Sequence, residues 1–270
     1  MKKLLTLLAL TISFSMNAQM SDNSANNNTA GSNAVAMGYN TIAIGSTSTS
    51  MGRNTAASGW FSTAMGYYTA ASGSYSTAMG NGTTADGSVS TAMGSFTTAS
   101  GSNSTAMGVV TTASDFASVV IGQYNSSGSS PTSVTSFSTY APAFVIGNGI
   151  DISNKSDAFK VMFNGDTTVG GDITISSDAR LKSNIVSLGS TLSKLLLIDG
   201  KSYEKDGKQR IGVLAQEIQE VFPELVTKDG NEMLAVNYQG LVPVLINALK
   251  EQDEKINRLE KLVEKLVANQ

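Results

Sequence analysis

The chain has 270 residues, of which only 14% are charged, and its formal net charge is −3. A typical soluble protein has about 25% charged residues, and a nucleic-acid-binding protein needs a basic surface, which this composition excludes. The sequence has no histidine and no cysteine. Their absence removes histidine and thiol catalysis, disulfides, and metal sites with His or Cys ligands. We therefore expect no cofactor and no metal, and any chemistry that remains would use serine, lysine or carboxylates.

The N-terminal segment has the pattern of a secretory signal peptide. Lys2 and Lys3 precede an apolar run at 4–14, which is too short to span the ~30 Å core of a membrane. Residues 1–18 are therefore predicted to be removed on export, and residues 19–30 to be disordered. We expect a mature chain without a transmembrane segment, secreted or held at the cell surface.

Residues 31–122 form a regular repeat. The residue before each glycine alternates between methionine and, in most cases, serine, so the true period is fourteen. A short fixed period with Thr-, Ser- and Val-rich segments between glycines predicts a parallel β-solenoid with a strand and a tight turn in each half-coil. Glycine occupies positions 31, 38, 45, 52, 59, 66, 73, 80, 87, 94, 101 and 108, and returns at 122.

The two faces of each strand are predicted to differ. Side chains alternate along a strand, so Ala64 and Met65 point in opposite directions. Because a thin coil admits only small side chains, we place the alanines inside and the Met row outside one sheet, with the Ser row outside the other. A stripe of exposed methionines is unstable on a monomer and favours self-association. A copper-binding row of thioethers is the weaker alternative.

Other residues of the repeat suggest less. Asp86 and Asp115 are too far apart for a glycosidase pair, and we expect both to be solvated. Ice binding would use the row of equivalent threonines that begins at Thr63. A flat ice-binding face needs threonine at both i and i+2 of a strand, and here the residue at i+2 is methionine. Aromatic residues near the turns are equally consistent with sugar or protein binding and with ordinary turn packing. These aromatic residues are Trp60, Phe61, Tyr67, Tyr68, Tyr75 and Phe96.

The repeat resembles a known family. Four units have the sequence Ser-Thr-Ala-Met-Gly, and they end at Gly66, Gly80, Gly94 and Gly108. They are similar to the head repeats of trimeric autotransporter adhesins. That resemblance implies a left-handed parallel β-roll of 14-residue coils that trimerises along one face.

Residues 123–176 are predicted to be a linker and a β neck. A Ser- and Thr-rich loop at 123–140 precedes expected short strands at 143–147, 158–163 and 167–175, with a hairpin turn at Asn164-Gly165.

The last part of the chain is predicted to be a small α/β domain at 177–240 followed by a coiled-coil helix at 241–270. The pattern indicates a helix at 187–197 and hairpins at Asp206-Gly207 and Asp229-Gly230. The coiled coil rests on apolar residues in a 4-3 spacing, and Ile at a with Leu at d leans towards a dimer. Its apolar positions include Leu245, Leu249, Ile256, Leu259, Val263 and Leu266.

A series of motifs in this region resembles the endosialidase-type intramolecular chaperone domain of tail fibres and tail spikes. The motifs are Ser177–Lys182, Asn184-Ile185, Ser202–Glu204, Ile211–Glu217, Phe222–Val226, Val236–Tyr238 and Ala248–Gln252. The resemblance implies a domain that trimerises the preceding fibre and then cuts itself off with a Ser-Lys dyad. By that resemblance Ser177 is the nucleophile, Lys182 is the general base, and the bond between Ser176 and Ser177 is cut.

This chemistry makes demands of its own. A lysine accepts a proton only when it is neutral, and burial lowers its pKa from an ordinary value near 10.4. Leu181 and Ile185 are candidate apolar walls for Lys182. A spacing of five residues is not a same-face spacing, so the dyad needs a turn between its members. In the alternative interpretation Ser177 or Asp178 only caps a helix and Lys182 is solvated.

Together these patterns predict a mainly β, secreted homotrimer with a β-roll head, a β neck, a small α/β chaperone domain and a C-terminal coiled coil. Its enzymatic activity would be a single-turnover serine autoproteolysis. Two alternatives stay open: a structural fibre with a retained, non-cleaving chaperone, and an ice- or glycan-binding solenoid. The head is expected to have a host-surface, glycan or matrix ligand, which the sequence does not identify.

Overall fold

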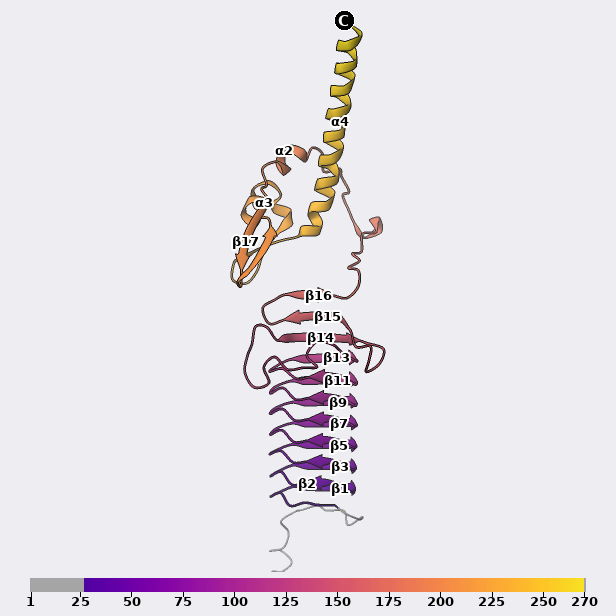
Figure 1. Ribbon diagram of the computed structural model, residues 1–270, viewed down its shortest axis with the longest axis vertical. Helices are drawn as coiled ribbons and strands as arrows, with labels where there is room; N and C mark the ends of the chain where they lie inside the picture. The colour runs from indigo at the N-terminus through magenta and orange to yellow at the C-terminus, as the bar shows by residue number, and fades with distance from the viewer. Residues whose placement is uncertain (1–26, 270) are drawn as a thin grey trace, which may run out of the picture. The chain divides into compact units, whose positions relative to one another are not determined.

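The computed structural model describes residues 27–269. The chain divides into two compact units between Ile175 and Ser176 (Figure 1). The predicted signal peptide lies outside the described residues. Within the described range, no helix has the length and apolar character needed to cross a membrane.

The first unit is a parallel β-solenoid with two sheets (Figure 1). Each coil contributes a long and a short strand, and equivalent strands pair in parallel with a register of fourteen residues, as in Met51 opposite Met65. The predicted coil length is therefore confirmed. The long strands are β1 (Val35–Tyr39), β3 (Thr49–Arg53), β5 (Thr63–Tyr67), β7 (Thr77–Asn81), β9 (Thr91–Ser95), β11 (Thr105–Val109) and β13 (Val119–Gln123). The short strands are β2 (Ile42–Ala43), β4 (Ala56–Ala57), β6 (Ala70–Ala71), β8 (Thr84–Ala85), β10 (Thr98–Ala99) and β12 (Thr112–Ala113).

The interior of the coil is filled by small side chains. The predicted inward alanines, such as Ala64 and Ala78, are fully buried, while Met93 keeps 39% of its surface exposed in the single chain. The placement of the alanines inside and the Met row outside is thus confirmed, whereas Ser114 departs from the predicted outward Ser row, because its hydroxyl bonds to the Gly128 carbonyl of the following loop and is buried. Buried rows of Ser and Thr also line the interior, a feature that the repeat pattern did not indicate. Ser62 Oγ donates to the Gly59 carbonyl at 2.8 Å, whereas the equivalent hydroxyls of Ser76 and Ser90 have no hydrogen-bond partner among the described residues.

Asp115 contradicts the expectation of a solvated carboxylate. Its exposed fraction is 0%, and its Oδ1 accepts hydrogen bonds from the backbone N–H groups of Thr132, at 2.5 Å, and Ser133, at 2.7 Å. Asp115 occupies the glycine slot of the last coil, where the following loop covers it instead of another coil. A side chain is accommodated there, and its carboxylate fastens that loop to the end of the solenoid.

The β neck continues the sheet of long strands. β13 pairs in parallel with β14 (Pro142–Asn148), and β15 (Asp157–Met162) and β16 (Thr167–Val169) follow antiparallel. The predicted hairpin between β15 and β16 is confirmed. The last strand ends at Val169 and not at 175, since Gly170 and Gly171 follow it.

The second unit packs short elements around the start of one long helix. Its core contains Ile218, Phe222, Leu225 and Val244, and the largest fully buried side chain is that of Ile218. Of the predicted helix at 187–197, only α2 forms, because Gly189 has a positive φ of 68° and the helix begins after it. Both hairpins and the long helix are confirmed, whereas α3 was not predicted. The elements are η1 (Ala179–Leu181), α2 (Leu192–Leu195), β17 (Lys201–Lys205), β18 (Lys208–Gly212), α3 (Ala215–Val221), η2 (Pro223–Leu225), β19 (Val226–Lys228), β20 (Leu234–Val236), η3 (Tyr238–Gly240) and α4 (Leu241–Ala268).

Candidate active site

The candidate site is built on a single turn at the start of the second unit. Asp178 caps η1, and its Oδ1 accepts a hydrogen bond from the Arg180 backbone N–H at 2.8 Å. The Arg180 guanidinium also donates to the same carboxylate, at 2.6 Å from Nη2 to Oδ2. The hydrogen bonds from Arg180, through its side chain first and then its backbone, lower the pKa of Asp178. The carboxylate therefore stays ionised and holds the turn closed.

This turn brings Ser177 and Lys182 together. The Lys182 backbone N–H closes the turn on the Ala179 carbonyl at 3.1 Å, and its side-chain Nζ donates to Ser177 Oγ at 2.7 Å. A lysine base needs the same two atoms in contact, but with the hydrogen bond reversed, so that the serine hydroxyl donates to a neutral lysine nitrogen before its proton is removed. The turn supplies the reversal that the spacing of five residues requires.

The surroundings of the pair are open in the single chain. Ser177 and Lys182 are both exposed. The expected apolar walls do not form within one chain, since Leu181 is 74% exposed and Ile185 is 66% exposed. The single chain therefore brings the two side chains of the dyad into contact without the apolar surroundings that a lysine base requires.

The capping interpretation is also partly right. Asp178 caps the turn as that interpretation requires, and Lys182 is exposed, but Lys182 nevertheless contacts Ser177. Ser176, which precedes the candidate nucleophile, is exposed as well. Among the described residues, no group of three or more His, Cys, Asp or Glu side chains has a metal-binding arrangement.

Glu251 links α4 to α2, a role that no sequence pattern indicated. Its carboxylate accepts hydrogen bonds from Ser190 Oγ at 2.6 Å, from the Thr191 backbone N–H, and from the Leu192 backbone N–H at 3.1 Å. These bonds, led by that from Ser190, lower the pKa of Glu251. Thr191 Oγ1 adds a bond to the Val244 carbonyl at 2.9 Å. The one sequence feature that pointed to Glu251 is its place in the motif Ala248–Gln252.

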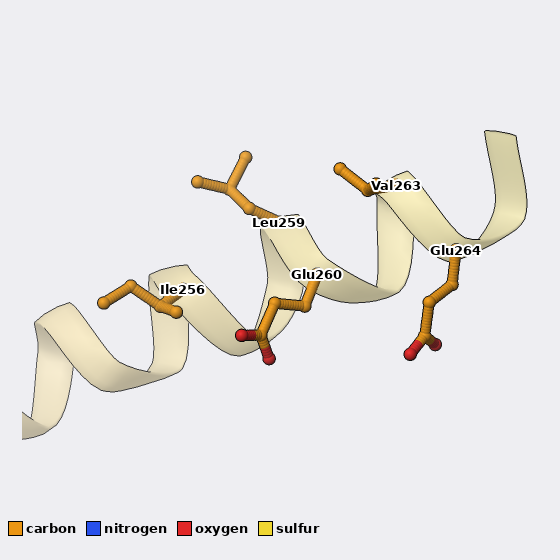
Figure 2. A pocket seen from close by; sticks show the side chains of 5 residues that line it. All are labelled: Ile256, Leu259, Glu260, Val263 and Glu264. Carbon is orange, nitrogen blue, oxygen red and sulfur yellow. The ribbon is translucent and has the colours of Figure 1, made fainter. Parts of the chain in front are cut away.

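The distal part of α4 carries an unpartnered apolar seam. Ile256, Leu259 and Val263 project from one side of the helix, with Glu260 and Glu264 beside them (Figure 2). Ile256 is 48% exposed, Leu259 is 61% exposed and Val263 is 58% exposed. This is the predicted 4-3 spacing, and a helix with such a seam pairs with other helices.

A segment of each unit matches a known family model. Residues 177–227 match the family model of the chaperone of endosialidase. Residues 43–69, 71–97, 90–111 and 99–125 match the YadA head domain repeat. The chain thus carries adhesin-type head repeats followed by an endosialidase-type chaperone domain, and both resemblances read from its sequence are confirmed.

Relatives among curated proteins are long tail fibre proteins of bacteriophages. The chain is 32% identical over 109 residues to the long tail fibre protein Gp37 of Escherichia phage AR1. This alignment covers 36% of the present chain and 9% of the phage protein. It is 35% identical over 100 residues to Gp37 of Enterobacteria phage T2, covering 33% and 8%. With Gp37 of Enterobacteria phage M1 it is 31% identical over 101 residues, covering 33% and 40%. The matched segments cover less than half the length of these relatives, and in them the chain is similar to tail fibre proteins.

Proposed function

We propose that the protein is an exported homotrimeric surface fibre whose C-terminal domain directs assembly and then cuts the chain before Ser177. The observation that carries the cleavage is the 2.7 Å hydrogen bond from Lys182 Nζ to Ser177 Oγ, on a domain of the chaperone family. The signal-peptide pattern and the tail-fibre relatives support export to a cell or virion surface.

Self-association is supported in each unit separately. In the solenoid, the Met row lines one outer face of the long-strand sheet and is partly exposed, as at Met37, Met93 and Met107. In the second unit, the seam of α4 is exposed over several turns. Apolar surfaces of this length on one chain are stabilised by burial against identical chains. A trimer places three Met rows against one another and three α4 helices in one bundle.

The reaction itself is an acyl transfer followed by hydrolysis. Lys182, once neutral, takes the hydroxyl proton while Ser177 Oγ attacks the carbonyl carbon of Ser176. The peptide C–N bond breaks, the proton passes to the released amine of Ser177, and an ester joins Ser176 to Ser177 Oγ. Water then hydrolyses the ester. Ser176 becomes a C-terminal carboxylate, and Ser177 regains its hydroxyl and becomes the new N-terminus.

Assembly would control the reaction through desolvation. An ammonium group loses its proton more readily when apolar neighbours exclude water. Leu181, Ile185 and Val186 lie close to Lys182 in sequence and are largely exposed in one chain, so they are available to be covered in a trimer. Cleavage would therefore follow trimerisation, and its rate would be nearly independent of protein concentration once trimers exist.

The second candidate function is a fibre that keeps its chaperone. The exposure of Ser177 and Lys182 in the single chain favours it, because a lysine base requires apolar surroundings that exclude water. Parallel expression of the wild-type chain and Ser177→Ala distinguishes the two functions on a denaturing gel. A fragment that is present in the wild type and absent in the variant supports self-cleavage, whereas a full-length wild-type trimer favours the retained chaperone.

A further inference from the structure

Arg53 is held between two tyrosines on the outer surface of the solenoid. Tyr39, Arg53 and Tyr67 occupy equivalent positions at the ends of β1, β3 and β5. The guanidinium carbon of Arg53 lies 5.5 Å from the centroid of the Tyr39 ring and 5.8 Å from that of the Tyr67 ring. The N–H groups of a guanidinium lie in its plane, so an arginine that packs against aromatic rings still has donors available for a ligand.

The donors of Arg53 have no acidic partner. Within 24–150, the charged residues are Arg53, Asp86 and Asp115, and Arg53 forms no ion pair in the described part of the chain. In a symmetric assembly the other chains bring the same residues to the same level of the solenoid, so residues 27–150 of those chains add no carboxylate at that level. Arg53 follows Met51 by two residues on β3 and is exposed in the single chain. A guanidinium buried without a partner is costly, so the site requires Arg53 to stay solvated at the rim of the Met face after assembly.

The neighbours of Arg53 are flat rings and uncharged amides. Tyr67 and Tyr68 form an edge-to-face pair with ring centroids 4.5 Å apart, and Tyr68 is 57% exposed. Asn40 Nδ2 donates to Asn54 Oδ1 at 2.8 Å beside them. The rings offer surface for the C–H face of a sugar, and the amides offer hydrogen bonds for its hydroxyls.

Tyr68 also occupies a position that its backbone does not favour. Its φ is 53°, and the equivalent residues in the two preceding coils are Asn40 and Asn54. Asparagine is enriched at positive φ, whereas a bulky residue is uncommon there. Aromatic residues nevertheless recur at this slot, since Phe96 and Tyr124 occupy it in later coils with φ of 54° and 43°.

We infer that Tyr39, Arg53, Asn54, Tyr67 and Tyr68 form a binding site for a carboxylate-bearing sugar of an acidic polysaccharide. Arg53 pairs with the carboxylate through two parallel N–H donors, and Tyr68 packs against the sugar ring. An acidic peptide fits less well, since one exposed ion pair contributes little affinity without ring packing. The inference rests on the proposed role of the solenoid as a surface-exposed head, and it names a ligand class for that head.

Binding of three carboxylated polysaccharides tests the site. Immobilised full-length protein is titrated with polygalacturonate, alginate and hyaluronan, and we expect at least one of them to bind. Fully methyl-esterified polygalacturonate is the matched ligand control, because it keeps the sugar rings and masks the carboxylates. Polyglutamate tests carboxylates without sugar rings. We expect both control polymers to bind much more weakly than the polysaccharide that binds best.

Four variants assign the binding to these residues. Arg53→Gln should weaken binding about tenfold, in line with the loss of a charge-assisted hydrogen-bonded pair. Arg53→Lys should recover only part of that loss, since it restores the charge without the planar pair of donors. Tyr68→Asn removes the ring and introduces asparagine, which the equivalent turns already contain at Asn40 and Asn54. This variant should weaken binding several-fold. Lys155→Gln removes the same charge from an exposed position elsewhere in the solenoid unit and should leave binding unchanged.

Failure of this site is distinguishable from failure of the proposed function. The inference is wrong if none of the three polysaccharides binds, if the esterified polymer binds equally well, or if Arg53→Gln binds like the wild type. If polyglutamate binds and its binding depends on Arg53, the ligand class is an acidic peptide and not a sugar, and the inference is also wrong. The mass of the same preparations reports cleavage, so a protein that binds but stays intact supports this site and counts against self-cleavage.

Discussion

Ser190 Oγ donates a hydrogen bond to Glu251 Oε2 at 2.6 Å and so joins residues that are 61 positions apart in the chain. Two backbone N–H groups at the start of α2 donate to the same carboxylate. A negative charge is favourable at a helix N-terminus, where backbone donors lack partners. Glu251 on α4 therefore fixes α2, which contributes Leu195 to the edge of the core.

Glu251→Gln should lower the stability of the second unit in a pH-dependent way. The pKa of Glu251 is lowered in the folded protein, so its stabilising effect is fully present above the ordinary value of 4.5 and is lost as the pH falls through the folded value. The variant should unfold at a lower urea concentration than the wild type at pH 7, and the gap should shrink by pH 3. Glu254→Gln, on an exposed face of the same helix, is the control. An equal gap at both pH values would contradict this account.

Charge on the Met face should prevent assembly. Met79→Asp combined with Met93→Asp should give aggregated or unfolded protein, because trimerisation would bury unpaired carboxylates. The measurement is the yield of soluble trimer by size-exclusion chromatography with light scattering. Ser58→Asp is the matched control, since Ser58 lies on the other sheet at the slot that Asp86 occupies two coils later. A stable monomer of the wild type at micromolar concentration would contradict the assembly account.

The stacking of the coils should not tolerate a side chain at Gly66. Its φ is +123°, and an added Cβ would lie 2.1 Å from the Gly80 carbonyl oxygen in the next coil. Gly66→Ala should therefore destabilise the solenoid by at least about 1–3 kcal/mol, from backbone strain alone, with the clash adding to it. Thermal unfolding checks the loss, and Ser58→Ala at an exposed position should change stability by less than about 0.5 kcal/mol. A wild-type melting temperature for Gly66→Ala would show that the coils can separate without cost.

The chaperone domain should be needed before the head can fold. A parallel solenoid has few local contacts, and unpaired chains expose sheet edges and the Met face. A chain that lacks 177–270 from the start of synthesis should therefore accumulate as aggregate. The measurement is the yield of soluble trimeric head from the truncated and complete chains. Equal yields would refute the chaperone role.

The solenoid could be predicted closely because one local rule repeats. A glycine every seven residues with an alanine two residues before it determines both the register and the inward face, and Ala64 and Gly66 lie where that rule places them. The burial of Asp115 could not be predicted in the same way. Its partners Thr132 and Ser133 come from a loop outside the repeat, and no local pattern connects them.

The second unit was less predictable because long-range contacts select its short helices. α3 is held by the packing of Ile218 and Phe222 against the start of α4, and that partner is distant in sequence. The candidate dyad came from resemblance, since the spacing of Ser177 and Lys182 argues against contact by itself. The turn that joins them depends on Asp178, whose capping role was foreseen only as the alternative to catalysis.

The intact mass of purified wild-type protein, beside Ser177→Ala, Lys182→Arg and the control Ser183→Ala, tests the central claim most directly. We predict that the wild type and Ser183→Ala yield a fragment from Ser177 to Gln270. Ser177→Ala and Lys182→Arg should yield only uncut chains, because alanine lacks the nucleophile and arginine does not release its proton. Cleavage of Ser177→Ala between residues 176 and 177, or wild-type trimers that are never cut, would contradict self-cleavage by this pair.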